Sequence, residues 1–276
     1  MTQTTTYTNP FQTAVIQNKM SSNQNKRGLA YNDPSLTYLF GGASSQVTWQ
    51  YDWGQDLCPH SNPDFECLPM LWSDSPTLTS TWNATVHAAV NAGSTRVLGF
   101  NEPDYSEQAN MSPKDAAKSW IEYMQPYADM VELGGPAITG QPSGLVWLQE
   151  FYGNLTHMNA TAFPDFQPVH WYDQAWNVGW FKIFITDAYE QTGVPVWITE
   201  FQGFGTDAQQ AAFFEEVSPW LDANSWVGGY AYFGVFNDNL VNFNGTNENV
   251  SGWPMLSLTG QAFDSYYNKT IPAAMQ

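Results

Sequence analysis

The chain has 276 residues, and its 26 Asp or Glu outnumber its 8 Lys or Arg, so the formal net charge at pH 7 is −18. This charge disfavours nucleic acid and anionic membrane partners, and no apolar run of about 18 residues is present to span a bilayer. Aromatic residues make up 16% of the chain and charged residues only 12%, which excludes an acidic disordered protein and favours a neutral ligand that stacks on aromatic rings.

Residues 1–26 are polar, and we expect them to form an N-terminal extension with little regular structure. After this extension, short apolar runs that end in polar residues predict eight strands. In chain order the runs span residues 27–33, 47–53, 66–72, 96–104, 131–138, 166–173, 195–202 and 227–234. Segments with helical character follow most of them, over residues 80–93, 112–130, 143–159, 176–193 and 206–224.

The boundaries of these segments agree with helices, because Ser112 with Pro113 is typical of a helix start and Gly93 and Gly193 are typical of helix ends. Strand followed by helix, repeated to a count of eight, predicts an α/β fold, namely a (β/α)8 TIM barrel that forms a single domain over residues 27–276. A doubly wound sheet is the alternative. Its Gly-rich phosphate turn is expected after the first strand, where this chain reads YNDPSL.

The cysteines and the glycosylation acceptors indicate the compartment. Cys58 and Cys67 are the only cysteines, and they bracket the turn-rich stretch CPHSNPDFEC, which a disulfide would close. Two unrelated thiols are the alternative. Seven Asn-x-Ser/Thr acceptors begin at Asn83, Asn110, Asn154, Asn159, Asn244, Asn249 and Asn268. Together these features predict a secreted glycoprotein, extracellular or in a cell wall.

Two glutamates end predicted strands, which is where the functional groups of a (β/α)8 barrel lie. Glu102 is in GFNEPD at the end of the fourth run, and Glu200 is in WITEF at the end of the seventh. Either one alone is compatible with a structural acid that is hydrogen-bonded in place. As a pair they predict glycoside hydrolysis, in which one carboxylic acid protonates the leaving oxygen and a second carboxylate acts at the anomeric carbon.

The runs GFNEPD, VHWYD, PVWITEF and VGGYAYFGVFNDNLVNFNG together resemble glycoside hydrolase family 128, a family of endo-β-1,3-glucanases with a glycosyl hydrolase catalytic core domain. The likeness extends from about Gly28 to Tyr267. It implies Glu102 as acid/base and Glu200 as nucleophile in a retaining hydrolysis of β-1,3-glucan. The chain departs from the family pattern at Asp52, where Asn is expected, and in the long loop after the eighth run.

Aromatic and polar residues at strand ends supply a candidate sugar-binding surface, since sugar rings stack on Trp and Tyr. The predicted substrate-binding residues are Asn32, Trp53, Trp72, Asn101, His170, Tyr172 and Phe233. Trp171, Trp176 and Trp180 are further candidate stacking platforms. In the sixth run, two-residue alternation places His170 and Tyr172 on one face and Trp171 on the other.

Other chemistries find less support in the sequence. The four histidines show no HExxH or HxH spacing, so no metal and no cofactor are expected. GxSxG and the nucleotide-binding motifs are also absent. Three alternatives stay open: an exo-acting or oligosaccharide-specific β-1,3-glucanase, a retaining glycosidase acting on a β-1,4-linked backbone, and a non-catalytic glucan-binding wall protein. The expected partner is β-1,3-glucan, and the high negative charge favours a monomer.

Overall fold

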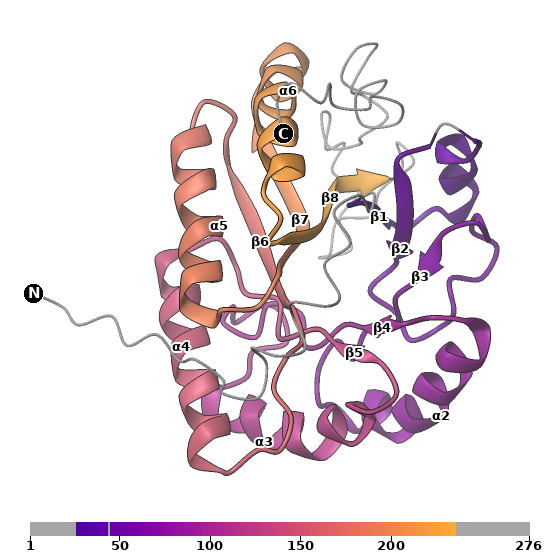
Figure 1. Cartoon of the computed structure of the whole chain (residues 1–276), viewed down its shortest axis with the longest axis vertical. Helices are drawn as coiled ribbons and strands as arrows, with labels where there is room; N and C mark the ends of the chain where they lie inside the picture. The colour runs from indigo at the N-terminus through magenta and orange to yellow at the C-terminus, as the bar shows by residue number, and fades with distance from the viewer. Residues whose placement is uncertain (1–25, 44, 236–276) are drawn as a thin grey trace, which may run out of the picture.

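The computed structural model of the protein describes residues 26–43 and 45–235 (Figure 1). The predicted N-terminal extension, apart from Lys26, lies outside the described residues. The long loop after the eighth run and three glycosylation acceptors lie outside them as well, namely Asn244, Asn249 and Asn268. The prediction of one domain over residues 27–276 therefore stays a prediction.

Each of the eight predicted runs contains a strand, and neighbouring strands are parallel. They are β1 (Arg27–Tyr31), β2 (Val47–Tyr51), β3 (Glu66–Cys67), β4 (Arg96–Val97), β5 (Glu132–Leu133), β6 (Gln167–Gln174), β7 (Val196–Phe204) and β8 (Val227–Val235). Ladders join six strands in the order β3-β2-β1-β8-β7-β6 and join β4 to β5. Single parallel bridges at Met70–Leu98, Gly134–Phe166 and Ile138–Val169 connect these two sheets. Pairing thus continues around the whole ring, and the predicted (β/α)8 barrel is confirmed.

The helices pack around the outside of the strands (Figure 1). They are η1 (Pro34–Phe40), α2 (Pro76–Ala92), α3 (Pro113–Tyr123), η2 (Gln125–Tyr127), α4 (Pro142–His157), α5 (Val178–Thr192) and α6 (Asp207–Ala223). The Ser112 side chain caps α3 by accepting from the Asp115 amide, and Gly93 and Gly193 end α2 and α5 with left-handed backbone, as predicted. No helix in the described part of the chain is long and apolar enough to cross a membrane.

One side of the barrel has short ladders, because β3, β4 and β5 contain two residues each. Arg96 links these strands at their amino ends. Its Nη1 lies 2.6 Å from Glu66 Oε2 of β3, and its Nε lies 3.0 Å from Glu132 Oε2 of β5. Its guanidinium also lies 5.1 Å from the ring centroid of Trp197 in β7. Charge-assisted contacts therefore support the side where backbone pairing is sparse.

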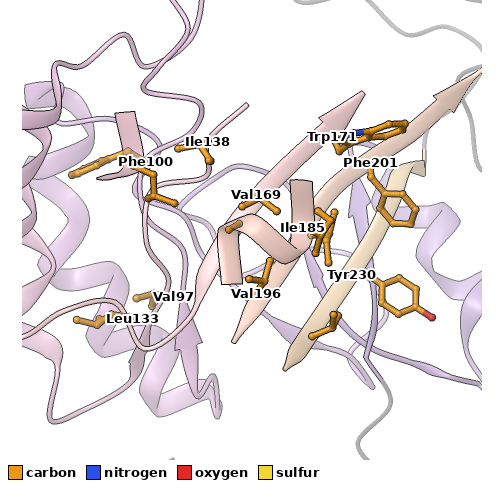
Figure 2. Close-up of a cluster of buried hydrophobic side chains, with 14 of the residues drawn as sticks. Val97, Phe100, Leu133, Ile138, Val169, Trp171, Ile185, Val196, Phe201 and Tyr230 are labelled. Atoms are coloured by element: carbon orange, nitrogen blue, oxygen red, sulfur yellow. The ribbon is translucent and has the colours of Figure 1, made fainter. Parts of the chain in front are cut away.

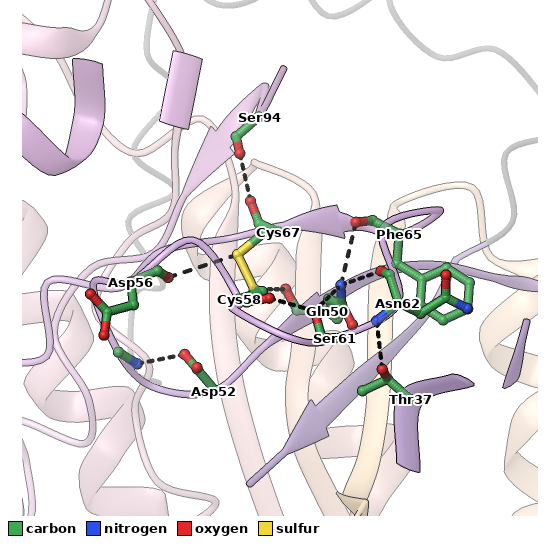
Figure 3. Close-up of a disulfide and its surroundings, with 11 residues drawn as sticks. Thr37, Gln50, Asp52, Asp56, Cys58, Ser61, Asn62, Phe65, Cys67 and Ser94 are labelled. Carbon is green, nitrogen blue, oxygen red and sulfur yellow. Dashed lines mark hydrogen bonds between the residues drawn. A yellow bond between two sulfur atoms is a disulfide. The ribbon is translucent and has the colours of Figure 1, made fainter. Parts of the chain in front are cut away.

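No helix is described between β2 and β3; a loop closed by a disulfide takes its place (Figure 3). The predicted Cys58–Cys67 bond is present, with the two Cα atoms 5.8 Å apart. Behind the loop, the buried Gln50 side chain donates to Ser61 Oγ at 2.9 Å and to the Asn62 carbonyl at 2.8 Å. The loop is thus anchored to the outer face of β2 by hydrogen bonds and to β3 by a covalent bond.

Successive side chains of a strand point alternately outward and inward, and they form two hydrophobic cores. The outer core lies between strands and helices, and Figure 2 shows Val169 and Trp171 of β6 with Ile185 of α5 in it. The inner core fills the barrel and includes Trp49 and Trp197, whose ring centroids are 5.0 Å apart. Because His170 and Tyr172 alternate with the outward residues of β6, they lie on the inner side, as predicted.

Gly28 of β1 is required by close packing inside the barrel. A Cβ atom at this position would lie 2.0 Å from Trp49 Cε2, and the ring of Trp49 is itself buried against Trp197. We therefore expect Gly28→Ala to lower the free energy of unfolding by roughly 1–3 kcal/mol, as overpacked cores do. Chemical denaturation measures this change.

Gly179→Ala is the matched control, because a Cβ atom at this helical position meets nothing within 4 Å. Alanine is the better helix former, so this variant should be as stable as the wild type or more stable. An equal loss of stability in both variants would contradict the packing argument.

Candidate active site

The structure brings Glu102 and Glu200 together, with Glu102 in the segment that follows β4 and Glu200 inside β7, which continues to Phe204 beyond the predicted strand end. A carboxylate oxygen of each, with a ring nitrogen of His170, forms a group of atoms that all lie within 4.8 Å of one another. The Glu102 side chain is 13% exposed and the Glu200 side chain 8%. The two predicted catalytic residues are therefore adjacent, and Glu102 is the more open to solvent.

Two site residues have a left-handed backbone conformation, which residues other than Gly, Asn and Asp rarely adopt. Glu102 has φ 42° and Trp53 has φ 61°. The strained backbone at Glu102 is held by the segment that follows β5, because the Glu102 amide donates to the Ala137 carbonyl at 2.8 Å. Such strain is often concentrated at functional sites, where surrounding structure holds it.

A bulge in β7 aims two consecutive side chains at the same neighbour. Val169 pairs with Ile198, yet His170 pairs with Glu200, so Thr199 is an extra residue on β7. His170 Nε2 consequently lies 3.1 Å from Thr199 Oγ1 and 3.4 Å from Glu200 Oε1. Regular alternation would have sent Thr199 and Glu200 to opposite faces.

His170 is fully buried between the two glutamates. Its Nδ1 lies 2.8 Å from Glu102 Oε1, and its Nε2 faces Glu200. Burial lowers the pKa of His170, but the charge of Glu200 and the charge and hydrogen bond of Glu102 outweigh burial and raise it above its usual value. The neighbouring carboxyl groups therefore favour the protonated imidazole more than water does, in spite of its burial.

Glu200 receives hydrogen bonds from aromatic residues of two other strand ends. The Tyr172 hydroxyl donates to Oε2 at 2.5 Å, and Trp53 Nε1 donates to Oε1 at 2.7 Å. The Tyr51 hydroxyl donates to the Thr199 carbonyl at 3.1 Å and lies 3.4 Å from Glu200 Oε1. Burial raises the pKa of Glu200, and the charge of His170 with the bonds from Tyr172 and Trp53 only partly opposes that rise.

Three other predicted binding residues differ in how closely they contact the side chains around Glu200. Phe233 packs edge-on against both Trp53 and Tyr172, with ring centroids 5.9 Å and 5.4 Å apart. Trp72 is half-buried against the inner core. Asn101 is buried and donates to Gln108 Oε1 at 3.2 Å, and its Oδ1 meets no hydrogen-bond partner among the described residues.

Two further strand-end residues lie outside these contacts. Asn32 is exposed at the end of β1, and its backbone amide donates to the Val235 carbonyl. Asp52, where the family pattern led us to expect Asn, accepts from the Gly54 amide at 3.0 Å and so stabilises its own turn. Burial raises the pKa of the Asp52 carboxyl.

The three additional tryptophan candidates differ in outcome. The prediction that Trp171 is a stacking platform is wrong, because its outward ring is fully buried against Phe181 and Phe213 of α5 and α6. Trp180 is half-buried and packs against Phe184 of its own helix. Trp176 is 76% exposed in the turn after β6.

The sequence interpretation missed two residues of the site, Tyr51 and Thr199. Tyr51 carried a usable signal, because it lies two residues before Trp53 and therefore shares its face of the strand. Thr199 carried none, since its inward position depends on a bulge that the residue pattern does not reveal.

Among the described residues, Glu102, His170 and Glu200 form a group whose ligand atoms are close enough to bind one metal ion. Both ring nitrogens of His170 already face oxygen partners, namely Glu102 Oε1 and Thr199 Oγ1. A cation would have to displace those contacts. The arrangement is better suited to a reaction that uses one carboxyl as a proton donor and a second, hydrogen-bonded carboxylate as a nucleophile.

Comparison with known proteins identifies relatives of the whole barrel. A family model described as "Glycosyl hydrolase catalytic core" matches residues 28–263. A curdlan-specific exo-β-1,3-glucanase of family 128 from Blastomyces gilchristii is 40% identical with a TM-score of 0.70, covering 83% of this chain and 97% of that chain. A family 128 endo-β-1,3-glucanase from Amycolatopsis mediterranei, solved with laminaritriose, is 25% identical with a TM-score of 0.65, covering 88% and 98%.

A curated relative is longer than this chain. Alkali-sensitive linkage protein 1 of Schizosaccharomyces pombe is 28% identical over 257 residues, which cover 89% of this chain and 45% of that protein. The chain thus spans about half the length of this relative.

The hydrogen bond from Tyr172 favours the ionised form of Glu200, since a carboxylate accepts it more strongly than a carboxylic acid does. We expect Tyr172→Phe to raise the pKa of Glu200 further, so that its titration midpoint moves to higher pH. Carbon-13 NMR of labelled glutamate carboxyl groups measures the midpoint. Tyr232→Phe is the control, because the Tyr232 hydroxyl donates to Gln210 instead. An unchanged or lower midpoint in Tyr172→Phe would rule out this role.

Proposed function

Because this chain belongs to the glycosyl hydrolase catalytic core family, and within it to glycoside hydrolase family 128, we propose that it hydrolyses β-1,3-glucan with retention of configuration. One observation carries the proposal: oxygen atoms of Glu102 and Glu200 lie within 4.8 Å of each other at the mouth of the barrel. Retaining glycosidases hold their two carboxyl groups about 5–5.5 Å apart, whereas inverting enzymes leave roughly 6.5–9.5 Å for a water molecule.

Two displacements at the anomeric carbon account for retention. In the first, Glu200 attacks that carbon and forms a glycosyl ester while Glu102 gives its proton to the departing glycosidic oxygen. In the second, Glu102 takes a proton from a water molecule, whose oxygen attacks the same carbon and releases Glu200. The first step leaves Glu200 esterified and Glu102 ionised, and the second frees the Glu200 carboxylate and gives Glu102 the proton of the water molecule, so the enzyme ends as it began.

The observed contacts support this division of roles. Glu200 is the more buried carboxylate and receives the bonds of Tyr172 and Trp53, which orient it and favour its ionised form. Glu102 is held through Nδ1 of His170 and is the more open to water. A nucleophile needs hydrogen bonds that keep it ionised and oriented, as Glu200 has. An acid/base group needs access to the leaving oxygen and to water, as Glu102 has.

The substrate class is proposed from the relatives. The Blastomyces relative is described as a curdlan-specific exo-enzyme and the Amycolatopsis relative as an endo-enzyme. Both descriptions support β-1,3-glucan as the substrate. The endo mode expected from the sequence stays a prediction, and the higher identity to the exo-enzyme favours removal of units from chain ends as the second candidate. Early products from a long glucan distinguish the two, since an endo-enzyme shortens the chains rapidly.

Substitution of either glutamate tests the proposal. We expect Glu102→Gln to lower kcat on laminarin and curdlan by about 10²- to 10⁴-fold, the usual contribution of an acid/base group, and Glu200→Gln to lower it at least as far. Reducing-sugar release measures both variants, and proton NMR of the first product should show the β-anomer. Glu190→Gln, an exposed glutamate of α5, is the control.

A fully active Glu200→Gln variant, or an α-anomer as first product, would contradict the mechanism. Cleavage of cellulose, mannan or xylan in place of laminarin and curdlan would contradict the substrate. Binding of glucan by the wild type without turnover would instead support a glucan-binding wall protein.

We also propose that the protein is secreted and glycosylated. The disulfide supports an oxidising compartment. Asn110 and Asn159 are exposed and have left-handed backbone with φ 48° and 56°. The amide groups of the other two described acceptors are engaged: Asn83 Oδ1 accepts from Tyr127, and Asn154 Nδ2 donates within α4.

We therefore expect glycans at Asn110 and Asn159 in protein secreted by a eukaryotic host. Peptide mass spectrometry after enzymatic deglycosylation detects each occupied site as a conversion of Asn to Asp. Unmodified asparagine at both positions would refute this assignment.

A further inference from the structure

Thr199 carries a buried hydroxyl beside the catalytic pair, and the mechanism proposed above gives this group no role. The residue is fully buried. Its Oγ1 lies 3.1 Å from His170 Nε2, which is the one hydrogen-bond partner of this hydroxyl within the part of the chain that the structure describes. Burial of a hydroxyl is costly unless it is hydrogen-bonded, so the contact with His170 is the reason that the group is tolerated there.

The backbone of β7 is arranged so that Thr199 and Glu200 both reach His170. The register between β6 and β7 shifts after Val169, which leaves Thr199 as an extra residue on β7. The Tyr51 hydroxyl donates to the Thr199 carbonyl at 3.1 Å and so ties this bulge to β2. Bulges often re-aim a side chain next to an active site. The position of the Thr199 hydroxyl is thus set by contacts with both β2 and β6.

A hydroxyl can pair with His170 in either protonation state of the ring. While Nδ1 donates to Glu102 Oε1, 2.8 Å away, Nε2 either carries a second proton or presents a lone pair. The Thr199 hydroxyl accepts a hydrogen bond in the first case and donates one in the second. An ionised carboxylate can only accept. Thr199 therefore keeps Nε2 paired whichever form the imidazole takes.

The other neighbour of Nε2 changes during the proposed reaction. In the free enzyme, Glu200 Oε1 lies 3.4 Å from Nε2 and offers it a negatively charged acceptor. In the glycosyl ester, Glu200 is neutral and accepts hydrogen bonds more weakly. Thr199 is then the remaining strong partner of Nε2, at the stage at which Glu102 must be held ready to take a proton from water.

We propose that Thr199 is a positioning residue for the second step of the reaction, in which it holds His170, and through it Glu102, while Glu200 is esterified. This inference rests on the proposed function and gives its two steps different requirements. In the second step a proton of water passes to Glu102, the water oxygen bonds to the anomeric carbon, and the ester bond to Glu200 breaks. The first step depends less on Thr199, because it begins with Glu200 ionised beside Nε2.

Dinitrophenyl β-laminaribioside separates the two steps, because dinitrophenolate leaves without a proton from Glu102. With this substrate kcat/KM reports the first step, and kcat falls when the second step slows. We expect Thr199→Val to lower kcat about 10-fold, as when a buried polar partner is left unpaired, and to change kcat/KM by less than about 2-fold. Thr199→Ser keeps the hydroxyl and should retain the wild-type kcat.

The intermediate and an external nucleophile give two further readouts. Mass spectrometry of acid-quenched enzyme should show a larger glycosylated fraction in Thr199→Val than in the wild type. Azide attacks the ester without giving up a proton, so it needs no general base and should raise the kcat of Thr199→Val towards the wild-type value. A merely structural defect would slow both steps and would not respond to azide.

Thr192→Val is the matched control, because it makes the same change at a buried threonine whose hydroxyl donates to the Ala188 carbonyl within α5. Both kinetic constants of this variant should match those of the wild type. Thermal unfolding shows whether each variant is folded. If Thr199→Val does not fold, the comparison of Thr199→Ala with Thr199→Ser tests the hydroxyl in the same way.

The outcomes separate this inference from the proposed function. Equal losses in kcat and kcat/KM in Thr199→Val, or no loss in either, would overturn the role of Thr199 alone, provided that the wild type hydrolyses the substrate with retention. A wild type that releases no dinitrophenolate and cleaves no β-1,3-glucan would refute the proposed function, and the role of Thr199 with it.

Discussion

The buried carboxylate of Glu200 is the constraint on which the site depends. A charge removed from water costs several kcal/mol unless hydrogen bonds replace its hydration. Here Tyr172 of β6 and Trp53 just after β2 supply those bonds, and His170 supplies an opposing charge. These residues come from opposite parts of the chain, so the bonds form only when β2, β6 and β7 are held in one closed ring.

The partner carboxyl group depends on the weaker side of that ring. Glu102 follows β4, where the ladder to β5 is only two residues long, and its strained backbone is held by the Ala137 carbonyl. At the opposite end of the same strand, Arg96 ties β4 to Glu66 and Glu132. Side-chain contacts thus hold the strands together on this side, as continuous backbone pairing does around β6, β7 and β8. The distance between the two carboxyl groups depends on both kinds of contact.

The architecture was largely predictable because it rests on local patterns. Eight apolar runs, the Ser112 cap and the Gly93 and Gly193 stops each depend on a few neighbouring residues, and all correspond to the structure. The Cys58–Cys67 bond was predictable from a short turn-rich spacing. The covering of β2 by a loop in place of a helix left no comparable signal, since nothing between residues 52 and 65 specifies which layer it joins.

The sequence by itself determined which two strand segments bear the carboxyl groups, and which face of β6 bears His170 and Tyr172, because the residue pattern of a strand and its alternation are local properties. Only the tertiary structure decided that the outward ring of Trp171 is buried under α5 and α6, that Tyr51 and Trp53 reach Glu200, and that Thr199 turns inward. Barrel closure and a one-residue bulge set those contacts, and both arise from the pairing of strands far apart in the chain.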